Sequence, residues 1–252
     1  MLMSERHAII LKELEQHPTI SIRTLTTSLG VSRETIRKDI ELLAQENKLK
    51  QVRGGATQVR TREFPMARRS QLNMNGKDRI ASCIADQIPN GISLILDNGS
   101  SVLAVARALS GHQDLIVYTN DLRVAEVIAP ATRELTVLGG RVDPAEMAVF
   151  GIEALEHLNR YRADFAIVSA GGLSSDAFLT DFNREASGLR HQMLCNAQTG
   201  FVLADSSKFE AVGHVLFPPV PKGTRIVTDE EPSAAIRRCV SQNGVELLIA
   251  HE

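Results

Sequence analysis

The chain has 252 residues, of which 43% are apolar, and its formal net charge at pH 7 is −2. This length allows one small domain and one of ordinary size, and an apolar content with eight Phe, two Tyr and no Trp suits an aliphatic α/β core. No apolar run approaches the length of a membrane span and no signal-peptide core is present at the N-terminus, so we expect a cytoplasmic protein with no membrane partner.

Charge is distributed unevenly along the chain. Residues 1–72 carry 13 Lys and Arg against 8 Asp and Glu, whereas the remaining residues carry 15 against 22. A basic first part and an acidic remainder fit one domain that binds a polyanion and one that does not. Cys83, Cys195 and Cys239 lie far apart, without CxxC or Cys/His ligand spacing. We therefore expect buried, reduced thiols, no disulfide, no metal and no cofactor.

Two helices are predicted before residue 31. The first covers residues 5–15, where apolar residues recur at helical spacing until Pro18 stops the helix. The second follows Ser21, whose side chain can cap it, and ends at Gly30, a residue that tolerates the positive φ of a helix C-terminus. Gly30 and the residue after it then provide a tight turn into a third helix.

The third predicted helix carries the strongest functional signal. Ser32 can cap it, and the residues behind the cap form one apolar stripe, which consists of Ile36, Ile40 and Leu43. The other faces hold short polar or basic side chains near the helix N-terminus: Arg33, Thr35, Arg37 and Lys38. A helix that enters the DNA major groove presents itself in this way, although an isolated basic helix is also compatible with a solvated surface.

A hairpin follows the third helix. Residues 48–52 and 56–59 are short extended runs on either side of Arg53, Gly54 and Gly55. Three helices and a basic hairpin make a winged helix-turn-helix. The candidate DNA-binding residues are Ser21, Ser32, Arg33, Thr35, Arg37, Lys38, Arg53, Gly54 and Gly55.

Residues 5–56 resemble the N-terminal domain of the DeoR family of bacterial transcriptional regulators. The resemblance is carried by Arg6, Ile10, Leu14, Leu25, the segment 29–32, the segment 35–40 and Gly54-Gly55-Ala56. The chain departs from the family at Arg53, where His is usual, and at Gln51, where a basic residue is common. We expect residues 1–59 to form this domain and 60–75 to connect it to the rest. The connector's arginines (Arg60, Arg62, Arg68 and Arg69) are either solvated or in contact with the DNA backbone.

Beyond the connector, short apolar runs alternate with amphipathic stretches. Strands are predicted over residues 92–96, 115–118, 135–138, 165–169, 201–204, 225–227 and 246–249. Helices are predicted over residues 77–87, 102–109, 152–158 and 184–197. Such alternation indicates a parallel sheet covered on both faces, in a Rossmann-like α/β domain over residues 76–252.

Polar or small residues follow five of these strands, in the segments 97–101, 118–121, 138–141, 169–172 and 204–209. Ligands of parallel sheets bind beyond the carboxyl ends of the strands, and a helix N-terminus after a glycine favours an anion. The pattern therefore predicts a shared pocket for a small anion.

Residues 77–229 resemble the sensor domain of the DeoR family, which is similar in fold to ribose-5-phosphate isomerase. The resemblance runs through Asp97-x-Gly-Ser-Ser, Thr119-Asn120, Leu138-Gly139-Gly140, Phe150-Gly151, Glu185-Ala186, the segment 204–209 and Thr228-Asp229. It implies a phosphorylated sugar or related effector, with phosphate at Gly99, Ser100, Ser101 and Lys208, and sugar hydroxyls at Asp97, Asn120 and Glu185. The full candidate set is Asp97, Gly99, Ser100, Ser101, Thr119, Asn120, Gly139, Gly140, Glu185 and Lys208. Departures at Asn98, 169–172 and 178–183 bear on which effector binds.

The sequence thus predicts a homo-oligomeric DNA-binding regulator, a repressor of a carbohydrate-catabolism operon, whose DNA affinity changes when an effector binds. Self-association is expected because helix-turn-helix domains read paired half-sites. One alternative is a sugar-phosphate isomerase-like enzyme with a nucleic-acid-binding head, for which the sequence offers no convincing acid/base pair, metal motif or nucleophile elbow. Another is the same regulator sensing an unphosphorylated sugar acid or polyol.

Overall fold

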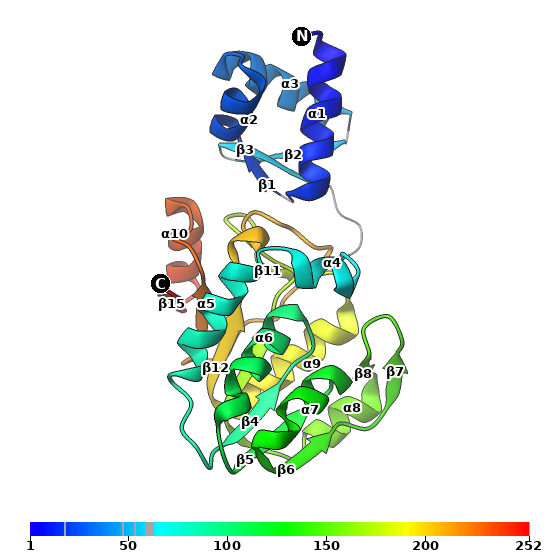
Figure 1. The fold of residues 1–252 in the computed structure, drawn as a ribbon, viewed down its shortest axis with the longest axis vertical. Helices are drawn as coiled ribbons and strands as arrows, with labels where there is room; N and C mark the ends of the chain where they lie inside the picture. Colours follow the sequence, from blue (N-terminus) through cyan, green and yellow to red (C-terminus); the bar gives the residue numbers. More distant parts are fainter. Residues whose placement is uncertain (18, 47, 53, 59–62, 252) are drawn as a thin grey trace.

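The computed structural model describes residues 1–17, 19–46, 48–52, 54–58 and 63–251. It has a small N-terminal domain, here called the head, and a larger α/β domain, here called the body (Figure 1). Arg53, Arg60 and Arg62, to which the sequence analysis assigned possible DNA contacts, lie outside the described residues.

The head contains the three predicted helices and a small antiparallel sheet. The elements are α1 (Met3–Gln16), α2 (Ile22–Leu29), α3 (Arg33–Gln45), β1 (Thr19–Ser21), β2 (Leu49–Val52) and β3 (Gly55–Gln58). The sheet order is β1-β3-β2, so the hairpin predicted from sequence gains a third strand, β1, that the sequence analysis did not identify. Apolar side chains of all three helices and of the sheet form one core, which includes Ile10, Leu25, Ile36, Ile40 and Leu49.

The body is built on a parallel sheet of seven strands. They are β4 (Ser93–Leu96), β5 (Leu115–Thr119), β6 (Thr132–Val137), β9 (Ala163–Ser169), β12 (Ala197–Leu203), β14 (Arg225–Thr228) and β15 (Glu246–Ile249). Their order is β15-β14-β12-β9-β4-β5-β6, and every neighbouring pair is parallel. The chain therefore fills one half of the sheet outward from β4 and then the other half outward from β9. The place where β4 and β9 meet is the switch point at which such sheets bind ligands.

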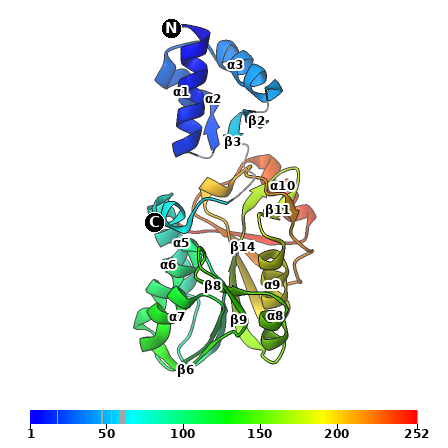
Figure 2. The same cartoon turned by 90° about the vertical axis from the view of Figure 1, so that its right-hand side faces the viewer.

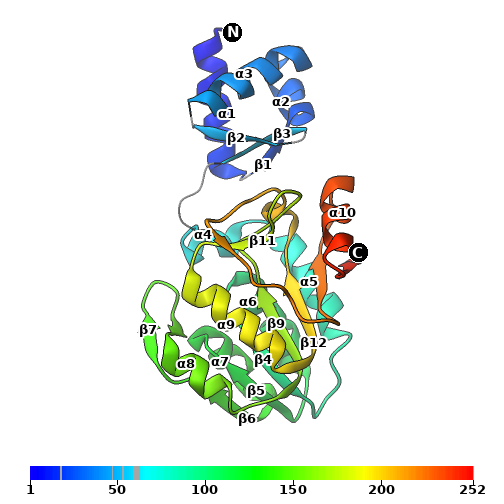
Figure 3. The same ribbon diagram turned by 180° about the vertical axis from the view of Figure 1, so that it is seen from behind.

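Helices cover both faces of this sheet (Figure 2). One face carries α5 (Met74–Ala85), α6 (Ser100–Ala108) and α7 (Leu122–Ile128), and the other carries α8 (Ile152–Leu158) and α9 (Arg184–Cys195), which Figure 3 shows from the front. Each face has its own apolar core, because the strand residues alternate between them: Leu94 and Leu96 pack beneath α6, and Ile95 packs on the side of α8 and α9.

Smaller elements surround the carboxyl ends of the strands. They are α4 (Met66–Gln71), the hairpin β7 (Arg141–Asp143) and β8 (Ala148–Phe150), the antiparallel sheet β10 (Gly172–Ser174), β11 (Phe178–Asp181) and β13 (Val215–Leu216), and α10 (Ala234–Gln242). Short 3-10 turns are η1 (Leu109–Gly111), η2 (Ala129–Ala131) and η3 (Ser206–Lys208).

The segment expected to be a connector contains α4, which packs on the body. Met66 and Arg69 of α4 are buried there, and Met66 joins the core beneath α5 and α6. The expectation that all three cysteines are buried is wrong, because Cys83 and Cys239 are half-buried and Cys195 is exposed. Among the described residues, no helix is long and apolar enough to cross a membrane.

Candidate functional site

The exposed face of α3 carries the basic side chains that the sequence predicted for DNA. Arg33, Arg37 and Lys38 are exposed and Thr35 is half-buried, while Ile36 and Ile40 are fully buried in the core of the head. The helix thus turns its apolar stripe inward and presents three cations near its N-terminus. This arrangement suits contact with base edges and phosphates.

Serine caps fix where α2 and α3 begin. Ser21 Oγ accepts a hydrogen bond from the Thr24 amide at 3.0 Å, and Ser32 Oγ accepts one from the Thr35 amide at 3.1 Å. Between the helices, Gly30 adopts the left-handed conformation with φ of 64°. Both serines are exposed, so their hydroxyls remain near any DNA that α3 contacts.

An ion pair between half-buried Arg6 and buried Asp39 holds α3 against α1. Arg6 Nε and Nη2 lie 2.7 and 2.9 Å from the two carboxylate oxygens of Asp39, and His7 Nε2 lies 3.2 Å from Asp39 Oδ1. Asp39 is 2% exposed, so the carboxylate inside the basic motif is a structural anchor for the helix. The sequence analysis did not assign it a role.

The wing glycines differ in environment. Gly54 is exposed with φ of 89°, whereas Gly55 is buried against β1, and a Cβ atom at Gly55 would lie 2.1 Å from the carbonyl oxygen of Ile20. The close pairing of β3 with β1 therefore requires glycine at residue 55.

In the body, Arg190 of α9 lies at the switch point of the sheet. Its Nε donates to Asp97 Oδ2 at 2.7 Å, Nη1 donates to Asp181, and Nη2 donates to Asn98 Oδ1 at 3.2 Å. Asp97 Oδ2 also accepts from the amide and the hydroxyl of Ser169 at the end of β9. Burial alone would lower the pKa of Arg190, but the charges of Asp181, Asp97 and Glu63 outweigh it and raise that pKa.

The predicted phosphate-binding segment forms the N-terminus of α6. Gly99 precedes the helix with φ of 129°, and Ser100 is its first residue. Ser100 lines a cavity of about 10 Å³ together with Ser207 and Lys208, and the other lining residues are Phe64, Arg69, Leu72 and Lys77. Backbone amides at a helix start and the cations Lys208 and Arg69 together favour a bound anion.

Hydrogen bonds hold the loop that carries Lys208. Asp205 Oδ1 accepts from the Ser207 amide at 3.1 Å and from Asn73 Nδ2 at 3.1 Å. Asn73 Nδ2 also donates to Asp229 Oδ2 at 2.8 Å, and Asp229 Oδ1 accepts from the Ser206 amide at 2.6 Å. The loop after β12 is thereby tied to the start of α5 and to the end of β14.

A carboxylate already faces these cations. Glu63 Oε1 accepts from Lys208 Nζ at 3.0 Å and lies 3.7 Å from Arg69 Nη1. Arg69 also donates to Glu146 and, through Nε, to the carbonyl of Phe64 at 2.9 Å. Burial alone would raise the pKa of Glu63, but the charges of Lys208, Arg69 and Arg190 outweigh it and lower the pKa to about 2.

A larger polar cavity lies on the other side of Glu63. Its volume is about 190 Å³, and its charged or amide-bearing lining residues are Glu63, Asn98, Asp143, Glu146, Asp181, Asn183 and Arg190. Carboxylates, amides and a guanidinium are the groups that hydrogen-bond polyhydroxylated molecules. The apolar part of the wall comes from Ala145, Phe150, Phe182 and Ala186.

Thr119 and Asn120 follow β5 and are fully buried. Thr119 Oγ1 accepts from the Asp121 amide at 3.1 Å, and Asn120 Nδ2 donates to the Val149 carbonyl at 3.2 Å. Asp121 Oδ2 in turn accepts from the Gly99 amide at 3.4 Å. This segment borders the α6 N-terminus and supports it from the side of β5.

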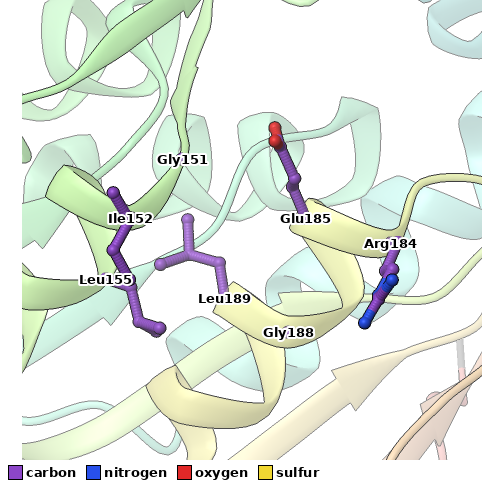
Figure 4. A pocket seen from close by; sticks show the side chains of 7 residues that line it. All are labelled: Gly151, Ile152, Leu155, Arg184, Glu185, Gly188 and Leu189. Carbon is purple, nitrogen blue, oxygen red and sulfur yellow. The ribbon is translucent and has the colours of Figure 1, made fainter.

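The remaining predicted residues lie apart, beside α8. The Gly139 amide donates to His157 Nδ1 at 2.9 Å, and a Cβ at Gly140 would meet Val149 at 3.1 Å. Glu185 accepts from Arg141 at 2.7 Å and lines an open groove of about 500 Å³ between α8 and α9. Figure 4 shows the apolar side chains of both helices along this groove and the Glu185 carboxylate directed away from Arg184. The structure therefore places Ser100 and Lys208 on one cavity and Asp97 and Gly99 beside Ser169 at the end of β9, and it leaves Gly139, Gly140 and Glu185 outside that cluster.

Sequence reasoning missed Arg190, Asp181, Arg69 and Glu63. A signal existed for Arg190, because it lies four residues after Ala186 on the buried face of α9, where an unpaired charge would be costly. Among the described residues, no group of three or more His, Cys, Asp or Glu could hold a metal ion.

A head with a recognition helix and a body with a polar pocket at the switch point define a two-domain DNA-binding regulator with a ligand-sensing domain. The profile of the DeoR-like helix-turn-helix domain matches residues 6–62, and that of the DeoR C-terminal sensor domain matches residues 72–230. The chain belongs to the DeoR family of transcriptional regulators, and it is a regulator rather than an enzyme.

Three curated relatives align over nearly the whole chain. The HTH-type transcriptional repressor CsqR of Escherichia coli is 30% identical over 98% of this chain and 95% of its own length. The glycerol-3-phosphate regulon repressor of Escherichia coli is 28% identical over 98% of this chain and 99% of its own length. The HTH-type transcriptional repressor GlcR of Bacillus subtilis is 29% identical over 100% of this chain and 98% of its own length. Ribose 5-phosphate isomerase A from Methanocaldococcus jannaschii aligns with 16% identity and a TM-score of 0.41 over 54% of this chain and 55% of that one.

Proposed function

We propose that this regulator is a cytoplasmic repressor of a carbohydrate-catabolism operon and that it is released from its operator by a phosphorylated sugar or related metabolite. The observation that carries the proposal is the meeting of the α6 N-terminus with Lys208 and Arg69, beside a polar cavity of about 190 Å³. A relative named for the glycerol-3-phosphate regulon supports a phosphorylated effector.

In this proposal the phosphate binds the amides and hydroxyls of Ser100 and Ser101 and the ammonium of Lys208. The polyhydroxylated part of the effector occupies the larger cavity near Asn98 and Arg190, which line it, and near Asp97, whose carboxylate Arg190 binds. Thr119 and Asn120 hold the segment around the α6 N-terminus. Gly139, Gly140 and Glu185 reach the effector only if the β7–β8 hairpin and α9 move toward it.

Operator binding is assigned to α3, the caps of α2 and α3, and the wing. Arg33, Thr35, Arg37 and Lys38 face the major groove, and Gly54 and Gly55 shape the hairpin beside Arg53. Because helix-turn-helix domains read paired half-sites, the working form is a homo-oligomer. Effector binding and operator binding must weaken each other by the same factor if they select different states of that oligomer.

The experiment is to recover and sequence genomic fragments bound by the purified chain, with and without a pool of sugar phosphates. We expect a few sites that are enriched without the pool and lost with it. Enrichment that ignores the pool would leave the head assignment intact and favour an unphosphorylated sugar acid or polyol as effector. Absence of enrichment, or a chain that remains monomeric at micromolar concentration, would contradict the proposal.

Lys208→Ala separates sensing from folding in the same assay. We expect this variant to enrich the same fragments, at reduced affinity because Lys208 also binds Glu63, and to show no change in DNA binding when sugar phosphates are added. A variant that binds no fragment at all would instead show that Lys208 is needed for folding.

A further inference from the structure

Glu63 lines the larger cavity, but its contacts with two cations are not explained by DNA binding or by the lining of that cavity. Its side chain is 19% exposed, and it contacts two cations that are themselves nearly buried, Lys208 at 12% and Arg69 at 5% exposure. Glu63 precedes α4, whereas Lys208 follows β12, so the pair joins segments 145 residues apart in sequence. The Glu63 carboxylate is therefore an anion of the protein itself, bound to the cations that the proposed function assigns to the effector's phosphate.

Glu63 also separates the two parts of the proposed effector site. On one side, the cavity with Ser100, Ser207 and Lys208 has a volume of about 10 Å³, close to the roughly 10–15 Å³ that a cavity needs to hold a single water molecule. On the other side, Glu63 lines the cavity of about 190 Å³ that contains Arg190. A phosphate is larger than a water molecule, so it has no room beside Ser100 while Phe64 lines this cavity and Glu63 binds Lys208.

We propose that the Glu63 carboxylate occupies the phosphate site when no effector is bound, and that a phosphate group displaces it and so releases the segment that leads to the head. The inference rests on the proposed function, since it describes how the same site is regulated. A phosphate monoester carries about −1.5 to −2 charges at pH 7 and more acceptor oxygens than a carboxylate, so it competes well for Lys208 and Arg69.

The displaced residue is close in sequence to the wing. Strand β3 ends at Gln58, and four residues separate it from Glu63. On the other side, Phe64 accepts a hydrogen bond from Arg69 Nε at 2.9 Å, and the guanidinium of Arg68 lies 3.7 Å from the centre of the Phe64 ring. Release of Glu63 thus removes an attachment to the body at the first described residue after the head.

The test compares full-length wild type with Glu63→Gln, which keeps the shape of the side chain and removes its charge. Binding of inorganic phosphate is measured by calorimetry, and binding of a labelled operator fragment is measured without phosphate. If the site is open in about one wild-type molecule in ten, Glu63→Gln binds phosphate roughly tenfold more tightly. We expect the same variant to bind the operator more weakly than wild type, because it resembles the released state.

Two further variants sharpen the comparison. Glu126→Gln removes an exposed carboxylate on α7 and leaves both affinities at their wild-type values. Glu63→Asp keeps the charge on a shorter side chain, so its phosphate affinity falls between those of wild type and Glu63→Gln. This second variant also answers the question if Glu63→Gln does not fold.

The outcomes distinguish the inference from the proposed function. If sugar phosphates release wild type from its operator but the Glu63 variants bind phosphate no more tightly than wild type, the inference is overturned and the proposed function stands. If phosphate binds tighter to Glu63→Gln while operator affinity is unchanged, the competition is real but the coupling to the head is refuted. If neither protein binds phosphate and operator binding ignores sugar phosphates, both proposals fail.

Discussion

Arg190 Nε lies 2.7 Å from Asp97 Oδ2, and both side chains are buried, at 3% and 1% exposure. The contact joins α9 on one face of the sheet to the end of β4 at the switch point. Because Arg190 also binds Asp181 at the end of β11, one guanidinium pairs with two buried carboxylates from separate strands.

Replacing Arg190 by Ala should therefore destabilise the body. The substitution leaves Asp97 and Asp181 buried without their counter-charge, which typically costs about 3–5 kcal/mol of the free energy of unfolding. Urea unfolding followed by circular dichroism measures the loss. The matched control is Arg184→Ala on the exposed side of the same helix, which should change stability by less than about 0.5 kcal/mol. Equal effects of the two substitutions would contradict the structural role of Arg190.

Glu63 should make the free energy of unfolding depend on pH. Its pKa of about 2 in the folded chain lies below the ordinary value of 4.5, so its stabilising effect is complete above about pH 4.5 and is lost as the pH falls toward 2. The shift corresponds to about 3 kcal/mol at neutral pH. The difference in unfolding free energy between wild type and Glu63→Gln should shrink over this range, measured in phosphate-free buffer. A difference that stays constant from pH 7 to pH 3 would show that the Glu63 charge does not act as described.

Arg37 and Lys38 should contribute to DNA binding in different ways. If Arg37 reads a base, Arg37→Ala weakens operator binding by about 1–3 kcal/mol and relaxes specificity at one position. If Lys38 contacts a phosphate, Lys38→Ala weakens binding to all sequences alike and reduces the salt slope by about 1. Fluorescence anisotropy with operator and unrelated DNA across a salt series measures both. Arg238→Ala, at an exposed position on α10, serves as the control for loss of charge alone.

Gly55→Ala should disrupt the wing, because the added Cβ would lie 2.1 Å from the Ile20 carbonyl oxygen. Overpacking of this kind costs about 1–3 kcal/mol, and the strands must separate to relieve it. The expected result is a lower melting temperature of the head and weaker DNA binding. Gly188→Ala provides the contrast, since the exposed helical glycine of α9 has open space around it. That change should stabilise the body by about 0.5–1 kcal/mol. A lower free energy of unfolding for Gly188→Ala would contradict the open space described around Gly188.

The elements with strong local signals were predictable from the sequence. The serine caps, Gly30 and the apolar stripe of α3 depend on neighbours within one or two helical turns, and the structure confirms all three. The inner strands of the parallel sheet are mostly buried, so each appears as a short apolar run whatever its partners. The edge strands β6 and β15 are only half-buried but keep enough apolar residues to give the same signal. Strand β1 was missed because three residues carry too little pattern to identify a strand.

The ion pairs of the body were not predictable in the same way. Glu63 and Lys208 are separated by 145 residues, and neither has a local feature that points to the other. The basic stretch at Arg68 and Arg69 indicated either solvent or DNA contact, but Arg69 is 4% exposed and bonded within the body. Such long-range pairing depends on how α4 packs against α6. Hydrophobic periodicity reports local structure only and does not predict this packing.

The short interval between β3 and Glu63 also limits the geometry of operator recognition. Five residue steps from Gln58 to Glu63 can span at most about 18 Å, so Gln58 of each head must remain within that distance of Glu63 while Glu63 is bound to Lys208. In an oligomer, the separation of the two Glu63 residues thus sets a ceiling on the half-site spacing that two heads can reach together. An operator with wider spacing would be excluded by the length of the backbone alone, even if every base in it matched.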